Sequence, residues 1–149
     1  MFLAIIAASM AVYDKLLRKL SAERGSFLSK FVIRNVPSGI KFDLHAANGQ
    51  SILTSEVYTT MAACRKGIAS VMKNAPLAKI ELQVDGQTKT LTNPKFELYQ
   101  DKAGFYRFRL KARNGEIIAV SERYTGKAGC LNGIDSVRRN AQSAEITEE

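Results

Sequence analysis

The chain has little of what most enzymes and metal proteins carry at their active sites. Its 149 residues include no tryptophan, three prolines, two cysteines (Cys64 and Cys130) and a single histidine, His45. No His/Cys cluster has the spacing of a structural zinc site. The motifs GxxxxGKS/T, GxGxxG and HExxH, which bind phosphates or catalytic zinc, are also absent. We therefore expect no metal, no cofactor and no catalytic residue.

The residues that come nearest to catalytic candidates have simpler interpretations. His45 lies on the polar face of an expected strand, which favours a surface role. Glu56 and Glu122 occupy equivalent positions ahead of two expected helices. A pair of carboxylates suits acid/base chemistry, but the positive end of a helix also favours carboxylates nearby, and we prefer this second interpretation.

Charge is the feature of the composition that points to partners. The chain has 22 basic and 14 acidic residues, which gives a formal net charge of +8, and it is otherwise composed like a globular protein, with 46% hydrophobic residues. A positive surplus favours anionic partners such as nucleic acid or acidic lipid headgroups. A well-solvated surface is the alternative.

The sequence repeats itself. Residues 48–75 match residues 114–141 at a constant offset of 66, with 15 of 28 positions identical. One supersecondary unit is therefore used twice. Each unit is close to the lower size limit for a core of its own, so we expect the two to share one core. Cys64 and Cys130 are equivalent in the repeat, and we expect buried free thiols in a reducing compartment; whether they approach each other stays open.

Each unit reads as three strands, a helix and a further strand. Residues 42–46 and 106–112 alternate apolar and polar side chains, as half-buried strands do. Residues 51–55 and 116–121 supply a third strand after Asn-Gly turns, and residues 78–84 and 144–147 a strand after the helix. Another strand is expected at residues 87–91.

Thr59 and Thr125 are expected to cap the helices, which end near Asn74 and Asn140. The helix positions that agree between the copies fall on one face, which is therefore the buried one. Gly67 and Gly133 stand at the same helical site in both copies. Because glycine costs a helix about 1 kcal/mol relative to alanine, its repetition indicates close approach by a neighbouring backbone.

The sequence also resembles a known family. The segments FRLKARNGEII, SERYT and GIDSVRRNA occur together and in order, and with them the chain resembles the YegP-like family of small, uncharacterised bacterial proteins over roughly residues 30–147. This resemblance implies an α+β fold of two intertwined β-β-β-α-β repeats with an antiparallel sheet, and homodimers among relatives that carry one unit. It implies no established activity, cofactor or catalytic residue.

We accordingly divide the chain into an N-terminal apolar and amphipathic helix (residues 1–25) and a single pseudo-symmetric domain (residues 26–149). The first repeat covers about residues 30–82 and the second about residues 95–147.

One strand of the second repeat suggests a contact with anions. Arg107, Arg109, Lys111 and Arg113 form a row of four cations roughly 7 Å apart, near the spacing of successive phosphates in a nucleic-acid strand. The matching row in the first repeat is Lys41, Asp43, His45 and Ala47. A solvated outer face is the alternative interpretation.

Residues 1–24 lie outside the repeats. Residues 1–13 carry no charge, too short a stretch to span a bilayer as a straight helix and without the basic start of a secretory signal. Apolar residues recur at helical spacing from Leu3 to Leu20, with basic residues on the polar face after Tyr13. Such a helix suits an anionic membrane surface. Self-association and docking on the protein's own domain would bury the same stripe, and a start codon assigned too far upstream is a further alternative.

The sequence therefore predicts a cytoplasmic, non-enzymatic protein that acts as a small binding or scaffold module. Two alternatives remain: sequence-independent binding of nucleic acid or other anions through residues 107–113, and association with the inner membrane surface through residues 1–24.

Overall fold

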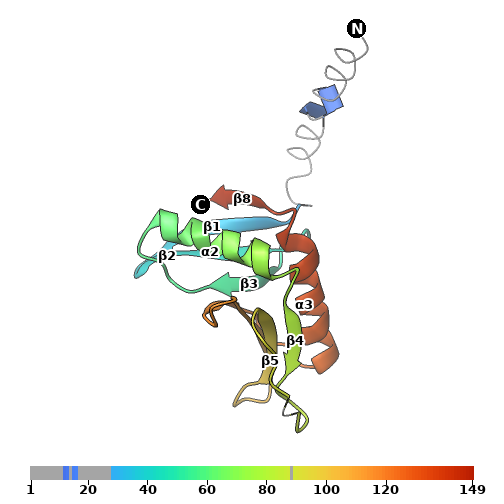
Figure 1. Cartoon of the computed structure of the whole chain (residues 1–149). Helices are drawn as coiled ribbons and strands as arrows, with labels where there is room; N and C mark the ends of the chain where they lie inside the picture. Colours follow the sequence, from blue (N-terminus) through green and yellow to red (C-terminus); the bar gives the residue numbers. More distant parts are fainter. Residues whose placement is uncertain (1–11, 14, 17–27, 88) are drawn as a thin grey trace.

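Eight strands and the helices α2 and α3 form the body of the protein. The computed structural model describes residues 12–13, 15–16, 28–87 and 89–149 (Figure 1). In chain order the elements are β1 (Lys30–Val36), β2 (Gly39–His45), β3 (Ser51–Ser55), α2 (Met61–Asn74), β4 (Lys79–Leu82), β5 (Lys95–Gln100), β6 (Tyr106–Lys111), β7 (Ile117–Val120), α3 (Lys127–Ala141) and β8 (Glu145–Glu148). The predicted α+β class is confirmed.

All eight strands belong to one sheet, in the order β4-β5-β6-β7-β3-β2-β1-β8. The order is symmetric: exchanging each strand of the first half with its counterpart in the second half, β1–β4 with β5–β8, gives the same order read in reverse. The strand that follows each helix pairs with the other half: β4 is parallel to β5, and β8 is parallel to β1. All other pairs are antiparallel, and at the centre β3 meets β7 through only two residue pairs. Each half therefore supplies an edge strand to the other.

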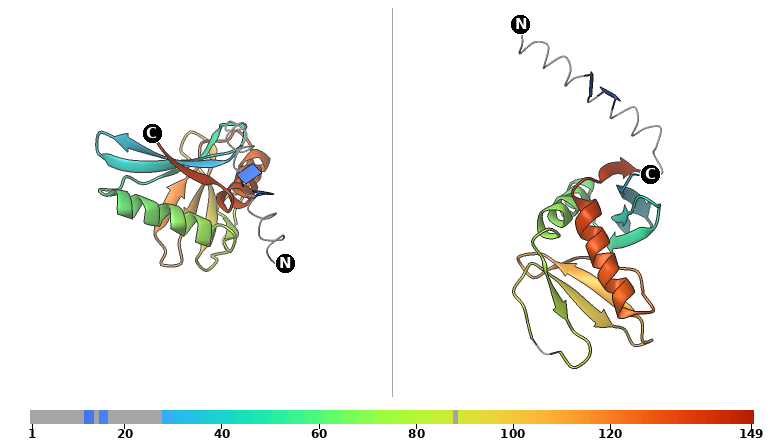
Figure 2. Two further views of the ribbon diagram at one scale, coloured as in Figure 1. Left: turned by 90° about the horizontal axis from the view of Figure 1, so that it is seen from above. Right: turned by 90° about the vertical axis from the view of Figure 1, so that its right-hand side faces the viewer.

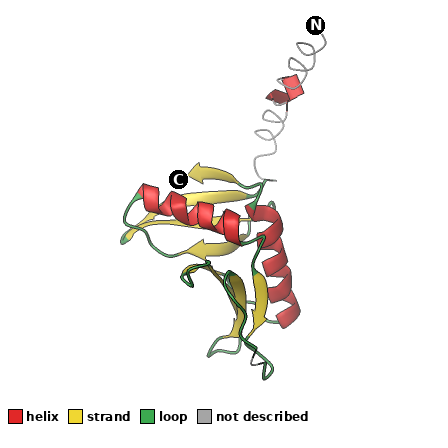
Figure 3. Ribbon diagram, in the orientation of Figure 1, coloured by secondary structure: helices red, strands yellow, loops and turns green. Residues whose placement is uncertain are grey.

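The sheet is strongly bent between its halves. In Figure 1, β8, β1, β2 and β3 run across the upper part of the molecule, whereas β4 and β5 run down the lower part. Helix α2 lies against β2 and against β7 of the other half, and α3 lies against β5, β6 and β3. Both helices cover the same face of the sheet, as the views in Figures 2 and 3 show.

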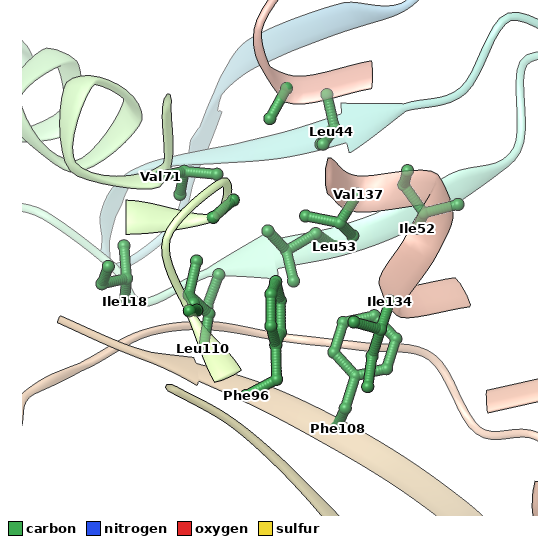
Figure 4. Close-up of a cluster of buried hydrophobic side chains, with 14 of the residues drawn as sticks. Leu44, Ile52, Leu53, Val71, Phe96, Phe108, Leu110, Ile118, Ile134 and Val137 are labelled. Atoms are coloured by element: carbon green, nitrogen blue, oxygen red, sulfur yellow. The ribbon is translucent and has the colours of Figure 1, made fainter. Parts of the chain in front are cut away.

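A single hydrophobic core joins the sheet to both helices. Figure 4 shows side chains of both halves converging on it, among them Leu53 and Phe96 from strands and Val71 and Val137 from helices. The phenylalanines repeat as well: Phe31 packs edge-on against Phe42, and Phe96 packs edge-on against Phe108. Apolar alternation along the strands and the helix face shared by the repeats both point into this core.

Tyrosine side chains explain the helical glycine that both repeats share. A Cβ atom at Gly67 would lie 2.2 Å from the Tyr58 hydroxyl, and one at Gly133 would lie 2.3 Å from the Tyr124 hydroxyl. The close neighbour is therefore an aromatic side chain, and our expectation of a neighbouring backbone was wrong. Each tyrosine is held in place by a backbone bridge, Tyr58 to Ile40 and Tyr124 to Tyr106.

Both helices begin one residue later than we predicted. Thr60, not Thr59, caps α2 and accepts a hydrogen bond from the Ala63 amide, while Gly126, not Thr125, precedes α3 and offers no side chain. Helix α2 ends at Asn74 as predicted, and α3 ends at Ala141, one residue beyond Asn140, but the C-caps Ala75 and Gln142 keep right-handed helical angles, so neither end makes a left-handed turn. Asn74 and Asn140 instead donate hydrogen bonds to backbone carbonyls four residues earlier.

The predicted strand at residues 87–91 was wrong. The described residues of the segment 83–94 form a loop that begins with a turn at Asp85 and Gly86, both with positive φ. The loop returns to the sheet at Leu91, whose amide donates to the Glu81 carboxylate at 2.6 Å. A side chain therefore accepts the hydrogen bond that a partner strand would have accepted.

The predicted N-terminal helix lies outside the described residues, apart from four positions. Val12, Tyr13, Lys15 and Leu16 are helical and exposed. Membrane association or self-association through residues 1–24 therefore stays a prediction. None of the helices in the described ranges is long and apolar enough to cross a bilayer.

Candidate functional site

Carboxylates neutralise most of the predicted cation row on β6. Arg107 pairs with Asp101 at 2.9 Å, and Arg109 pairs with Glu97 at 2.6 Å and lies over the ring of Tyr99. Lys111 approaches Glu97 at 3.3 Å. Arg113 lies beyond the end of β6, is exposed, and makes no ion pair with the described residues. Of the four predicted contact residues, only Arg113 is therefore free to meet an external anion.

The ion pairs continue into a buried network under the loop 83–94. Lys95 Nζ lies 2.8 Å from Glu81 and 3.3 Å from Glu97, and the side chains of Lys95 and Glu81 are only 8% and 4% exposed. Burial alone would raise the pKa of Glu81. Hydrogen bonds from Lys95, the Leu91 amide and Gln83 outweigh burial and lower the pKa from 4.5 to about 2. Glu81 therefore stays ionised and holds the loop against the sheet.

Replacing the lysine of this network should strongly destabilise the protein. Lys95→Met would leave Glu81 buried without its cation, and we expect a loss of about 3 kcal/mol in the free energy of unfolding, measured by urea denaturation. Lys30→Met is the matched control, because Lys30 occupies the same place in the first half, where Val32 and Thr147 replace the two glutamates. The control should change stability by less than about 0.5 kcal/mol. Equal losses in both variants would contradict the role given to the network.

A different surface gathers cations that are not neutralised. Helix α2 and the turn between β6 and β7 border an open hollow of about 590 Å³. Three cations line it: Lys66 and Lys73 from α2 and Arg113 from the turn. The rest of the lining is neutral and comprises Ala69, Ser70, Asn74, Leu77, Pro94, Ala112 and Asn114. We call this hollow the basic groove.

The cations of the basic groove have no internal counter-charge. No carboxylate lines the hollow, and among the described residues none forms an ion pair with Lys66, Lys73 or Arg113. All three side chains belong to exposed residues. Three like charges facing one hollow raise the local positive potential and attract anions.

The second copy of the repeat shows that the fold does not require these charges. At the equivalent positions Asn132 replaces Lys66, Ala47 replaces Arg113, and Arg139 replaces Lys73. Arg139 is paired at 2.9 Å with Asp135, which stands where the first copy has Ala69. The three cations of the basic groove therefore give a formal charge of +3. At the equivalent positions of the second copy, Arg139 (+1) and Asp135 (−1) cancel, so the formal charge is zero. A charge that folding demanded would be present in both copies.

A second hollow extends the basic groove along α2. It has a volume of about 390 Å³ and shares Lys66, Ser70, Ala112 and Asn114 with the first. Tyr58, Ile117 and Glu116 lie at its far end. Burial raises the pKa of Tyr58, so its hydroxyl is neutral at physiological pH and can donate a hydrogen bond. Because it contains the Glu116 carboxylate and the neutral Tyr58 hydroxyl, the far end is less basic than the end beside Lys73.

The two cysteines and the two glutamates considered as catalytic candidates line neither hollow. Cys64 and Cys130 are buried free thiols, and burial raises the pKa of Cys130 to about 11, which suppresses the reactive thiolate. Glu56 and Glu122 are exposed and lie five residues ahead of their helices, on the N-terminal side where we expected them. Within the described part of the chain, no three His, Cys, Asp or Glu side chains gather closely enough to hold a metal ion.

Sequence reasoning identified Arg113 but missed Lys66 and Lys73. The signal was present in the repeat, because Lys66 and Arg113 are cations at positions where the other copy is neutral. What the repeat alone cannot show is that α2 packs beside the β6–β7 turn of the other half, which brings these residues together.

Comparisons with known proteins agree with the repeated architecture. The family model described as "Domain of unknown function (DUF1508)" matches residues 39–81 and residues 101–148. A UPF0339 protein of Photorhabdus laumondii is 38% identical over 107 residues, which cover 72% of this chain and 81% of that protein. A UPF0339 protein of Treponema denticola is 63% identical over 54 residues, which cover 36% of this chain and 93% of that protein. The latter is therefore close to one repeat in length.

A solved structure shows the same fold. The solution structure of the protein of unknown function yegP from Escherichia coli matches with a TM-score of 0.68 and 31% sequence identity, over 83% of this chain and 94% of that one. The resemblance found in the sequence is confirmed at the level of both sequence and fold. The chain therefore belongs to the DUF1508 family of UPF0339 proteins, the family of yegP.

Proposed function

We propose that this protein is a non-enzymatic binding module and that the basic groove holds an anionic ligand. The observation that carries the proposal is the set of three cations around one hollow, Lys66, Lys73 and Arg113, which form no ion pair within the described part of the chain. Electrostatic attraction to a ligand is the use of these charges that the structure supports best, since the second copy folds without them.

The size and lining of the basic groove suit a ligand of small-molecule dimensions. Binding sites for small molecules typically occupy about 300–1,000 Å³ and combine apolar walls with a few polar groups. Here Leu77, Pro94 and Ala112 supply apolar wall, and Ser70 and Asn114 supply hydrogen-bonding groups. The ligand is thus held by charge at the cations and by contact along the walls.

The chemistry of the other candidates supports a binding role over catalysis. Nucleophilic catalysis needs a nucleophile hydrogen-bonded to a base. In the described ranges, neither Cys64 nor Cys130 makes such a bond with a side chain, and both thiols have a pKa raised by burial. His45, on β2, lines neither hollow.

Tripolyphosphate is a suitable probe of anion binding. We expect it to raise the melting temperature of the wild-type protein and to bind measurably in calorimetry. Lys73→Glu combined with Arg113→Glu should weaken binding more than about tenfold, because contacts to charged groups are worth about 1.5–3 kcal/mol each. Calorimetric titration at a fixed, low salt concentration gives the affinity directly.

The control is a variant with the same change in net charge elsewhere. Lys41→Glu combined with Lys102→Glu alters two cations that line neither hollow and make no ion pair with the described residues. If both double variants lose the same affinity, binding follows net charge alone and the proposed site is wrong. Absence of binding to the wild-type protein would reject an anionic ligand.

A further inference from the structure

The shape of the basic groove points to a linear ligand. The basic groove and the second hollow share four lining residues, and together they follow α2 from Ala63 to Asn74 and reach Leu77 just beyond its end. Eleven helical steps of 1.5 Å make the part of this path beside α2 about 16 Å long. A channel of this length beside a helix fits an extended chain better than a compact anion.

The cations are spread along the path. Lys66 and Lys73 are seven residues apart, which places them on the same face of α2 and about 10 Å apart along its axis. Arg113 faces them from the β6–β7 turn. Because lysine and arginine have long, flexible stems, three separate anionic groups of one extended chain can each reach a cation.

The walls beside these cations suit flat apolar groups. Leu77 is 65% exposed at the basic end, and Pro94 lies in the same wall. Their counterparts in the repeat are Ser143 and Ser29, and Ser29 hydrogen-bonds to the carbonyl of Asn140. The apolar surface is therefore confined, like the positive charge, to one of the two equivalent places.

Asn114 adds a polar group that can reach a ligand. Its side-chain oxygen accepts a hydrogen bond from the Glu116 amide, which fixes the side chain in the wall. Its Nδ2 group has no partner among the described residues and is available as a donor. Donor groups of this kind bind phosphate oxygens or the edges of bases.

We infer that the ligand is a single-stranded nucleic acid, with about three phosphates on Lys66, Lys73 and Arg113 and bases against Leu77 and Pro94. This inference rests on the proposed anion binding and names its ligand. A strand that carries both phosphates and flat bases matches a path lined by both cations and apolar side chains. Glu116 in the second hollow marks the end of the strand's path, because a carboxylate repels the phosphate backbone.

The dependence of binding affinity on salt concentration provides a quantitative test of the inference. Contact with three phosphates of a single strand predicts a slope of about −2 in a plot of log affinity against log salt concentration. Between 50 and 200 mM salt the affinity should therefore fall by about 18-fold. Lys73→Ala should reduce the slope to about −1.4, which is a fall of about sevenfold over the same range.

Fluorescence anisotropy with labelled oligothymidylate and oligouridylate tests the inference on the full-length protein. Leu77→Ala should weaken binding at every salt concentration without changing the slope, because it removes contact to bases and no charge. Lys102→Ala is the matched control for loss of one cation and should leave both affinity and slope unchanged. Binding of one oligonucleotide or of both supports the inference and shows whether the strand is DNA, RNA or either.

Three results would overturn the inference. The first is binding of tripolyphosphate without binding of either oligonucleotide, which would leave anion binding intact and reject the nucleic acid. The second is equal or tighter binding of a duplex of the same length, because the path beside α2 is too small to hold a duplex and a duplex keeps its bases stacked inside. The third is an unchanged slope in Lys73→Ala, which would place the strand elsewhere on the protein.

Discussion

Residues 93–149 expressed alone are expected not to fold as a monomer. In the full chain, β5 of this half pairs with β4 of the other, and β8 extends away to pair with β1. The isolated half would keep its helix but lose the neighbours of β5, β7 and β8. It would also expose Phe96 and the other side chains that meet the first half in the shared core. About 57 residues with half a core cannot offset the entropy of folding.

The same fragment should fold when it pairs with a second copy. Its β8 can then lie beside β5 of the partner, as Glu145–Glu148 lies beside β1 in the full chain. Its melting temperature should rise with protein concentration, as mass action requires of a folded dimer. Analytical ultracentrifugation combined with thermal melts followed by circular dichroism measures both properties.

Mixing provides the control for this experiment. Equimolar residues 26–92 and 93–149 should restore a complex with the circular dichroism spectrum of the intact chain, because all strand pairs are then available. Cooperative melting of either fragment as a monomer, independent of concentration, would show that the halves do not depend on each other's strands.

Gly133→Ala should strongly destabilise the intact protein. The new Cβ would lie 2.3 Å from the hydroxyl oxygen of Tyr124, 2.7 Å from its Cζ, and 3.0 Å from Cε1 of Phe108. Tyr124 is stacked on Phe108 and tied by its backbone to Tyr106, so the ring cannot move away freely. We expect a loss of about 2–3 kcal/mol, even though alanine improves helix propensity by about 1 kcal/mol.

Helix α3 contains its own control for this substitution. A Cβ at Gly129 would lie at an ordinary 3.6 Å from Tyr124, and the equivalent residue of α2 is already alanine, Ala63. Gly129→Ala should therefore leave stability unchanged or raise it by up to about 1 kcal/mol. Urea denaturation of both variants, with midpoints compared at unchanged slope, measures the difference.

A double-mutant cycle identifies the cause. If the clash with Tyr124 destabilises Gly133→Ala, the same change should cost much less in a Tyr124→Ala background, where the ring is absent. Two results would contradict the described packing: an equal loss of unfolding free energy when Gly133→Ala is made in the Tyr124→Ala background, or wild-type stability of Gly133→Ala alone.

Local patterns made much of the secondary structure predictable. Strands β2 and β6 follow the apolar alternation of residues 42–46 and 106–112, and α2 ends at Asn74 as expected. These features depend on side chains only a few residues apart, which sequence spacing reports directly. The errors arose where a tertiary contact replaced a local one, as when Glu81 accepted the Leu91 amide in place of a strand partner.

The candidate site was less predictable than the fold. The cations at positions 107, 109 and 111 look free in the sequence, but their partners Asp101 and Glu97 lie on the other side of a hairpin. Conversely, Lys66 and Arg113 are 47 positions apart and belong to different repeats, so no local pattern connects them. The electrostatic effect of a charged side chain depends on which other charges lie near it in the folded protein.

The sequence by itself determined the repeated unit, the α+β class and the buried faces. Comparison of the two copies reveals the repeat, and the spacing of apolar residues a few positions apart indicates the strands, the helices and their buried faces. Only the tertiary structure decided which charges are neutralised and which are free. The physical reason is that β4 and β8 pair across the two halves, and no short-range pattern specifies that exchange. The same packing of the halves sets α2 beside the β6–β7 turn and so forms the basic groove.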